Sequence, residues 1–368
     1  MAGRSQDGTN ISSDAWYAFD GPESDVVLST RVRLARNLAN FPFPAKFKDD
    51  DAYRVQTLVF DSFSHCSEPD KYQGVAAGGL DELGALILEE RGVIEEGAAR
   101  QGGSGIIVRT DGRIACEINS HDHVRLSSFV PGLDGSAAFS LCAGVDDELQ
   151  NTMQFAADYD IGYLTSSLAD CGSGMKVSCR VHLPSLSFSG KLPAVLNALS
   201  KKEIIVSDCF GAGSVPMSSL GFYYQVSTKS AGGGSELDQL AVLVSAVKYL
   251  AENERRERAA VLRGRQTELR DRIYRSYAKV RFASLLDARE SVEAVSDIKW
   301  GKSLGFFSGV DDPQLCALLY RVQKGHIRFV LKNRKFNFPA DISGDETLKT
   351  KYLRSLILQE AFQDMRVS

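Results

Sequence analysis

Residues 26–34 read VVLSTRVRL, and this stretch has the side-chain pattern of a β-strand. With the two-residue period of a strand, Ser29, Arg31 and Arg33 fall on one face and the residues between them fall on the other. The Phe-Pro-Phe-Pro sequence at 41–44 ends this element, because proline cannot continue a strand ladder. The stretch therefore predicts a strand that presents two arginines side by side on one face.

The same period recurs further along the chain. Residues 106–118 predict a hairpin around Asp111-Gly112, a dipeptide that favours tight turns, and the hairpin leads into the sequence NSHDH at 119–123. Residues 124–130 and 175–183 should also be extended, the second with Lys176 and Arg180 on its polar face. Shorter strands are expected at 204–206 and 222–227.

Helices are predicted elsewhere. Residues 51–95 are expected to be mostly helical, and 190–201 should form a further helix. A glycine run at 232–234 is the clearest break in composition, and Ser235 after it caps a long amphipathic helix. Helices continue from there to the C-terminus. These patterns divide the chain into a flexible lead-in at 1–20, a first domain at 21–232 and a helical region at 233–368, whose first helix packs on the first domain.

The composition is that of an ordinary globular protein. Of the 368 residues 43% are hydrophobic and 24% are charged, and the net charge of −4 gives no general attraction to nucleic acid. No apolar run approaches the roughly 20 residues that a membrane span needs, and the polar N-terminus lacks the apolar core of a secretory signal. We therefore expect a cytoplasmic protein that binds neither membrane nor nucleic acid. None of the seven cysteines forms a C-x-x-C pair, so no disulfide framework or metal site is indicated.

Several motifs together resemble one enzyme family. The sequence LSTRVRLARN at 28–37, followed by FPFP, is similar to the start of bacterial protein-arginine kinases, which belong with creatine and arginine kinases to the ATP:guanidino phosphotransferases. Further matches follow in family order and at family spacing: DHVR at 122–125, FVPGL at 129–133, GYLTS at 162–166 and VHLP at 181–184. A weaker helical similarity runs to the C-terminus.

The resemblance implies an α+β fold: a small N-terminal region, an antiparallel-sheet catalytic domain with flanking helices, and a helical C-terminal domain. It implies transfer of the γ-phosphate of ATP to a guanidinium, with Mg²⁺ carried by the nucleotide. The nucleotide-binding residues would be Ser29, Arg31, Arg33, Arg125, Lys176 and Arg180. Arginine suits this role, since its permanent charge and two-pronged hydrogen bonding match phosphate oxygens. The family also suggests a homodimer, with a protein arginine substrate or a protease or stress regulator as partner.

The sequence departs from the family where the acceptor would bind. The resemblance places the catalytic residues at His121 and Asp122, and His121 stands where the family has its catalytic glutamate. Ala212 replaces a second acidic residue, and Ser167 replaces a reactive cysteine. Two further changes affect the phosphates, because Ser207 and Lys176 stand at family arginines. The family's C-terminal RDxxRA motif, which binds phosphoarginine, is not retained at 347–352.

Three functions fit this pattern. The first is a kinase with weak or lost activity. The second is a non-catalytic nucleotide-binding pseudokinase or regulatory protein. The third is an enzyme with a different acceptor, in which His121 is a general base. Separately, residues 255–281 hold ten Lys/Arg against three Asp/Glu. We interpret them as a solvated helical face, with a docking surface for an acidic partner as the alternative.

Overall fold

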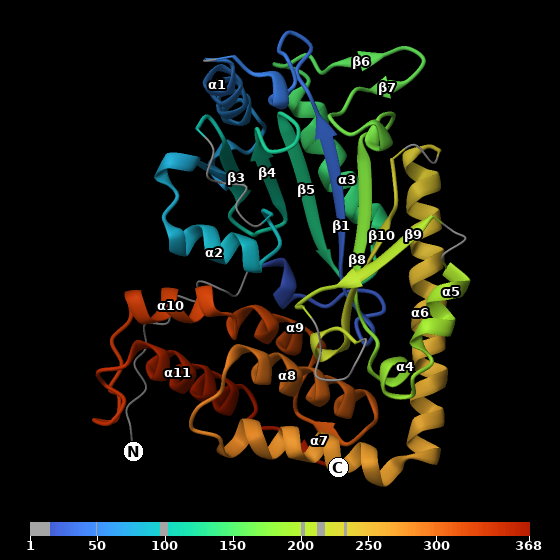
Figure 1. Cartoon of the computed structure of the whole chain (residues 1–368), viewed down its shortest axis with the longest axis vertical. Helices are drawn as coiled ribbons and strands as arrows, with labels where there is room; N and C mark the ends of the chain where they lie inside the picture. The colour runs from blue at the N-terminus through green and yellow to red at the C-terminus, as the bar shows by residue number, and fades with distance from the viewer. Residues whose placement is uncertain (1–14, 49, 96–101, 200–202, 212–217, 232–233) are drawn as a thin grey trace.

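The computed structural model describes residues 15–48, 50–95, 102–199, 203–211, 218–231 and 234–368. An antiparallel sheet of eight strands forms its centre, in the order β2-β3-β4-β5-β1-β8-β10-β9 (Figure 1). The strands are β1 (Val27–Arg36), β2 (Tyr72–Ala76), β3 (Gly105–Arg109), β4 (Ile114–Ile118), β5 (Val124–Pro131), β8 (Met175–His182), β9 (Ile204–Asp208) and β10 (Tyr223–Thr228).

Helices surround this sheet and form the C-terminal part. Those within the first 200 residues are α1 (Asp51–Ser64), α2 (Glu82–Glu90), α3 (Gly135–Leu149), α4 (Pro184–Phe188) and α5 (Leu192–Leu199). The later ones are α6 (Glu236–Gly264), α7 (Gln266–Phe282), α8 (Ala288–Ser303), α9 (Asp312–Arg321), α10 (Lys324–Asn333) and α11 (Glu346–Ala361). Two small two-stranded sheets are also present, one of β6 (Ala157–Asp158) with β7 (Gly162–Tyr163), the other of β11 (Phe307–Ser308) with β12 (Arg366–Val367).

The expected α+β fold is confirmed, as are the arginine-bearing strand and the hairpin around Asp111-Gly112. Residues 51–95 are mostly helical, as expected, but they also contain β2, a short strand at the sheet edge that pairs with β3. Its sequence, YQGVA, is too short to show a two-residue period. The helical C-terminal part also contains β11 and β12, which were not expected. The division at residue 232 falls outside the described residues and stays a prediction.

The apolar face of the sheet packs against α3 and the first half of α6, which runs along one side of the molecule in Figure 1. Val32 on β1 and Val177 on β8 lie opposite each other and are fully buried. Leu243 and Val247 of α6 are buried in the same core. The capping box that begins α6 at Ser235 confirms the predicted helix start. With this face covered, the opposite face of the sheet is left to carry polar side chains.

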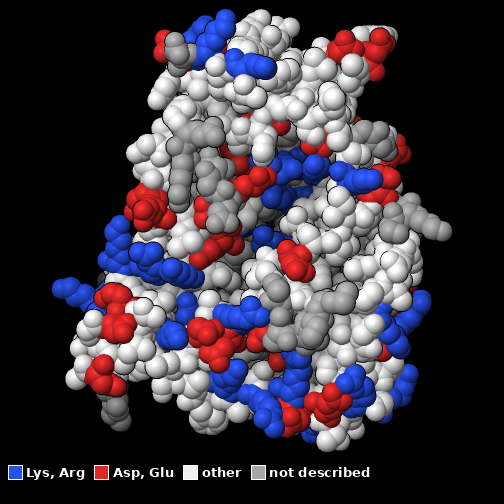
Figure 2. Space-filling view, viewed as in Figure 1, with Lys and Arg blue, Asp and Glu red and all other residues white. Residues whose placement is uncertain are grey.

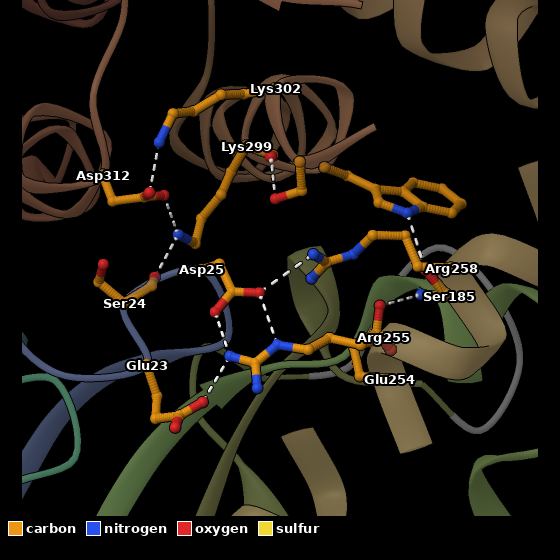
Figure 3. Close-up of polar contacts among 12 residues, drawn as sticks. Glu23, Ser24, Asp25, Ser185, Glu254, Arg255, Arg258, Lys299, Lys302 and Asp312 are labelled. Carbon is orange, nitrogen blue, oxygen red and sulfur yellow. Dashed lines mark hydrogen bonds and ion pairs between the residues drawn. The ribbon is translucent and has the colours of Figure 1, made fainter. Parts of the chain in front are cut away.

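A cluster of ion pairs joins the chain just before β1 to the helical part (Figure 3). Arg255 and Arg258 of α6 bind Asp25, and Arg255 also binds Glu23. Close by, the buried Lys299 of α8 donates to the carbonyl of Ser24 and pairs with Asp312 of α9. The start of the arginine-bearing strand is therefore fixed against three helices.

Most of the basic residues at 255–281 form ion pairs with acidic residues of the same chain. Ion pairs within the structure involve Arg255, Arg256, Arg258, Arg265, Arg272, Arg275 and Lys279. These contacts support the interpretation as a charged helical surface over that of a docking site. Within the described part of the chain, no helix combines the length and the apolar character that crossing a bilayer requires.

Candidate functional site

The polar face of the sheet brings together the side chains that the sequence placed at a nucleotide site. Strand β1 lies between β5 and β8, and its residues Ser29, Arg31 and Arg33 share one face. In the register with β8, Lys176 lies opposite Arg33 and Arg180 lies opposite Ser29. Strands β1 and β8 thus present four cations over a small area. We call Arg31, Arg33, Arg125, Lys176 and Arg180 the phosphate cluster.

Arg125 completes this cluster from β5. Ser127 lies opposite Arg33, and Arg125, two residues away on the same strand, projects from the same face. Arg125 also lies opposite Glu117 of β4. Figure 2 shows Lys and Arg side chains gathered in a hollow at the centre of this side of the molecule, with acidic side chains at its margin. The register of the sheet therefore builds a cationic hollow from residues far apart in sequence.

Arg31 shows that the cluster is short of anionic partners. Its Nη2 donates to Ser127 Oγ at 3.0 Å, and its guanidinium lies 5.1 Å from the ring centre of Phe129. Its Nε is buried without an acceptor among the described residues. Burial and the nearby charge of Arg33 lower the pKa of Arg31 to about 9. A phosphate would give this half-buried cation both the charge and the acceptor that it lacks.

Three carboxylates border the cluster. Glu117 Oε2 lies 3.7 Å from Arg125 Nη1, and burial raises the pKa of this glutamate. Asp170 Oδ1 lies 3.1 Å from Lys176 Nζ. Glu95, just after α2, has Oε1 at 2.7 Å from Arg125 Nη2. Sequence reasoning missed Glu95, because the segment that holds it has no recognisable period or motif, and its position next to β5 is a tertiary contact.

Arg180 is half-buried at the other end of the cluster. Its Nη1 donates to the hydroxyl of Tyr320 on α9 at 2.9 Å. Gly92 has a positive φ of 71°, and a Cβ there would lie 2.5 Å from Arg180 Nη2, so a larger residue would displace this arginine. A cavity of about 540 Å³ lies next to it, lined by aromatic and apolar side chains that include Trp16, Phe129 and Tyr320. The C-terminal part of the chain thus contacts Arg180 of the phosphate cluster directly.

The loop at the open end of the β3–β4 hairpin is firmly anchored. Asn119, in the left-handed region at φ 53°, donates through Nδ2 to the carbonyls of Ala52 and Gly103. Asp122 is buried, and its Oδ1 accepts from Asn37 Nδ2 and from the backbone N–H of Ser166, both at 2.7 Å. These contacts indicate that Asp122 positions the loop.

His121 is the exposed residue of this anchored loop. Its side chain is 73% exposed, and Nε2 lies 3.3 Å from Glu95 Oε2. Because a carboxylate can only accept, the imidazole N–H is the donor in this contact. The loop therefore holds His121 at the rim of the phosphate cluster, next to a carboxylate that the sequence did not lead us to expect.

The remaining positions at which the sequence departs from its family are Ser167, Ser207 and Ala212. Ser167 is exposed just before a short 3₁₀ turn at Leu168–Asp170. Ser207 is exposed on β9 opposite Gln225, which itself lies opposite Arg180. Ala212 lies outside the described residues. Within the part of the chain that the structure describes, no three His, Cys, Asp or Glu side chains gather in a way that could hold a metal ion.

Comparison with known proteins shows which family this chain belongs to. The model of the ATP:guanido phosphotransferase C-terminal catalytic domain matches residues 54–257. The chain belongs to the ATP:guanido phosphotransferase family. The protein-arginine kinase McsB C-terminal domain matches residues 266–365, so the two family models meet where α6 gives way to α7. The family resemblance predicted from the sequence motifs is confirmed.

Several relatives of this chain are named protein-arginine kinases. One from Halothermothrix orenii is 31% identical over 343 residues, which cover 93% of this chain and 97% of the relative. Another from Geobacillus stearothermophilus is 30% identical over 322 residues, covering 87% of this chain and 88% of the relative. The match therefore extends through both the sheet and the helical part.

Solved structures of ATP:guanido phosphotransferases share the fold. Lombricine kinase superimposes with a TM-score of 0.56 at 18% identity, covering 68% of this chain and 71% of that one. The duplicated taurocyamine kinase of Schistosoma mansoni, solved with bound transition-state-analogue components, superimposes with a TM-score of 0.55 at 20% identity, covering 76% of this chain and 36% of that one. At this identity the likeness establishes the sheet architecture.

Proposed function

We propose that this protein binds MgATP in the phosphate cluster and transfers the γ-phosphate slowly to the guanidinium of a protein arginine. The observation that carries the proposal is the cluster itself, in which Arg31, Arg33, Arg125, Lys176 and Arg180 share one face of adjacent strands. Phosphoryl transfer depends chiefly on positioning and on cations that stabilise charge at the leaving oxygen. Such a cluster supplies both.

The nucleotide fits the residues present. The unpaired Nε of Arg31 is a buried donor that calls for an anionic acceptor. Lys176 keeps a charge where its relatives have arginine but offers a single ammonium in place of a fork. Mg²⁺ would enter with the phosphates and neutralise part of their charge, while Arg125 and Arg33 hold the transferred group. We expect weaker nucleotide binding than a complete set of arginines would give.

We expect a slow rate because of the residue at position 121, where the acceptor guanidinium would bind. A carboxylate at position 121 would accept two guanidinium N–H bonds and attract the positive substrate, whereas imidazole offers at most one acceptor nitrogen. His121 is exposed at the rim and donates through Nε2 to Glu95, which leaves Nδ1 as its one acceptor nitrogen. We expect transfer to be weak for this reason.

A second candidate is a non-catalytic, nucleotide-binding regulator. Loss of the acidic residue at 121, the thiol at 167 and the arginine at 207 favours it, since all three changes remove chemistry while the cluster on β1, β5 and β8 remains. Such a protein would act as a homodimer or through a protease or stress-regulator partner in the cytoplasm. The two candidates share the nucleotide site and differ in turnover.

Incubation with MgATP and an arginine-rich protein separates them. Phosphoarginine is read by mass spectrometry under non-acidic conditions, with the Arg31→Ala variant as the control for contaminating kinase. Slow accumulation in the wild type that is absent from the variant supports the kinase. MgADP binding by calorimetry without any phosphoarginine supports the regulator, and absence of both nucleotide binding and transfer contradicts the proposal.

A further inference from the structure

Glu95 contacts both the phosphate cluster and His121. Its Oε1 lies 2.7 Å from Arg125 Nη2 and 3.7 Å from Arg33 Nη1, while its Oε2 lies 3.3 Å from His121 Nε2. One carboxylate therefore contacts both the cations that would hold the transferred phosphate and the residue that stands at the family's acceptor glutamate. Its side chain is 53% exposed, so a guanidinium on another molecule can reach it.

On the basis of the proposed function, we propose that Glu95 is a catalytic residue that binds the acceptor guanidinium, and that it occupies the phosphate cluster only while nucleotide is absent. A triphosphate carries more negative charge than one carboxylate and offers more acceptor oxygens to Arg125 and Arg33, so it displaces Glu95 from them. The displaced carboxylate remains beside His121. It then faces the side from which an acceptor must approach the γ-phosphate.

The other carboxylates near the cluster do not meet these requirements. Glu117 is 3% exposed beneath Arg125, out of reach of a substrate. Asp122 is also buried and engages Asn37 and Ser166. Asp170 pairs with Lys176 of β8, which lies across β1 from the strand that carries Arg125. Among the described residues, Glu95 alone has contacts to both the phosphate cluster and His121.

Nucleotide binding would also make Glu95 a better base. Burial raises its pKa, but the hydrogen bond from Arg125 and the charges of Arg125, Arg33 and His121 outweigh this and lower the pKa to about 2. A triphosphate that neutralises these arginines removes much of that effect, so the pKa of the carboxyl rises towards its ordinary value. The carboxylate is thus made more basic when a phosphate is in place to be transferred.

In the transfer step, the proton, the bond formed and the bond broken can each be assigned to named groups. Glu95 accepts two N–H bonds from the guanidinium and takes one proton as the nitrogen lone pair forms the N–P bond. The bond between the γ-phosphorus and the bridging oxygen breaks, and ADP keeps that electron pair. His121 orients the carboxylate through its Nε2–H and is a positioning residue in this scheme.

Two titrations of the full-length protein test the role of Glu95. The first measures MgADP affinity by calorimetry. The second adds N-acetyl-arginine amide to protein saturated with MgADP and nitrate, a planar anion in place of the transferred phosphoryl group. Glu95→Gln keeps the shape of the side chain and removes its charge. Glu268→Gln is the matched control, because Glu268 is 57% exposed and also pairs with an arginine, Arg265, far from the sheet face.

We expect Glu95→Gln to bind MgADP about threefold more tightly or better, because the competing carboxylate is gone, and to bind the arginine ligand roughly tenfold or more weakly, as loss of a charge-assisted contact predicts. The control should match the wild type in both. His121→Gln, which can still donate, should retain arginine affinity better than His121→Ala does.

The possible contrary results distinguish the role of Glu95 from the proposed function. Unchanged affinity of Glu95→Gln for both ligands overturns the role of Glu95 while the proposed function stands. Wild-type protein that binds MgADP but not the arginine ligand also overturns it and favours the regulator. Failure of the wild type to bind MgADP overturns the proposed function itself, and with it the idea that a triphosphate displaces Glu95.

Discussion

Arg33 on β1 and Lys176 on β8 lie directly opposite each other in the antiparallel register. Like charges at directly opposed positions destabilise a sheet, and here Arg125 adds a third cation nearby, which lowers the pKa of Arg33 after the larger effect of burial. Asp170 and Glu95 offset this repulsion from the two sides. The sheet therefore holds charge that a bound polyphosphate would neutralise.

Anion binding should stabilise the fold measurably. We expect both MgADP and inorganic tripolyphosphate to raise the melting temperature by several degrees at about 100 times their Kd, since a ligand at that concentration adds roughly 2.7 kcal/mol to the unfolding free energy. AMP, which lacks the terminal phosphates, should have a smaller effect. An equal rise in sodium chloride at matched ionic strength would show that general screening, and not the cluster, is responsible.

Arg31→Ala should weaken MgADP binding strongly. Arg31 is held under the site by Ser127 and Phe129 and has an unpaired Nε, so it is positioned to donate to phosphate. A charge-assisted hydrogen bond is worth roughly 1.5–3 kcal/mol, which corresponds to about a 10- to 150-fold loss of affinity. Arg113→Ala, at the β3–β4 turn, is the matched control. Unchanged affinity in the Arg31 variant would show that the phosphates bind elsewhere.

The fold and half of the site could be predicted because both depend on local pattern. The two-residue period around Arg31 and Arg33 is visible in the sequence, and the family motifs predicted an antiparallel sheet with flanking helices. Edge strand β2 was missed because YQGVA is defined by its pairing with β3 and not by its own period. Glu95 was missed for a related reason, since its contacts to Arg125 and His121 join segments that are 26 to 30 residues apart.

Limited proteolysis should cleave near the glycine run at 232–234, because glycine-rich stretches between packed elements are open to proteases. The fragments should nevertheless stay together under native conditions. Leu243 and Val247 of α6 are fully buried in the core beneath the sheet, and Arg255 binds Asp25. A denaturing gel should show two bands, while gel filtration shows one peak at the intact size. Separation of the fragments on the column would make the part after Ser235 an independent unit.

His123 should make the stability depend on pH. Its Nδ1 accepts from the N–H of Leu38 and its Nε2 donates to the carbonyl of Pro42, both at 2.9 Å, so the buried ring is neutral. Burial lowers the pKa of His123 to about 4. The folded pKa lies below the unfolded value of about 6.5, so the stability from the neutral ring is fully present above pH ~6.5 and is lost as the pH falls towards 4.

Urea unfolding at several pH values measures this effect. The unfolding free energy of the wild type should exceed that of His123→Gln at pH 7.5, and the difference should shrink by up to about 3 kcal/mol as the pH falls to 4. A difference that stays constant across this range would mean that His123 keeps an ordinary pKa in the folded protein.

The last prediction concerns turnover, which should be very slow in this chain. The acceptor guanidinium is protonated at neutral pH and is not a nucleophile in that form, so carboxylates must remove a proton and hold the planar group in line. His121 supplies no negative charge and Ala212 no polar group, which leaves Glu95 as one carboxylate where the family has two. A general base contributes typically 10²–10⁴-fold to the rate.

Restoring both acidic residues should therefore raise phosphoarginine formation. We expect His121→Glu combined with Ala212→Glu to increase the rate by more than the product of the two single effects, because groups that grip one guanidinium together act as a unit. Adding Arg31→Ala to this double variant should abolish the gain, since the reaction still depends on the phosphate cluster. Wild-type turnover in the ordinary kinase range of roughly 1–100 s⁻¹ would contradict the prediction and favour His121 as a working base for a different acceptor.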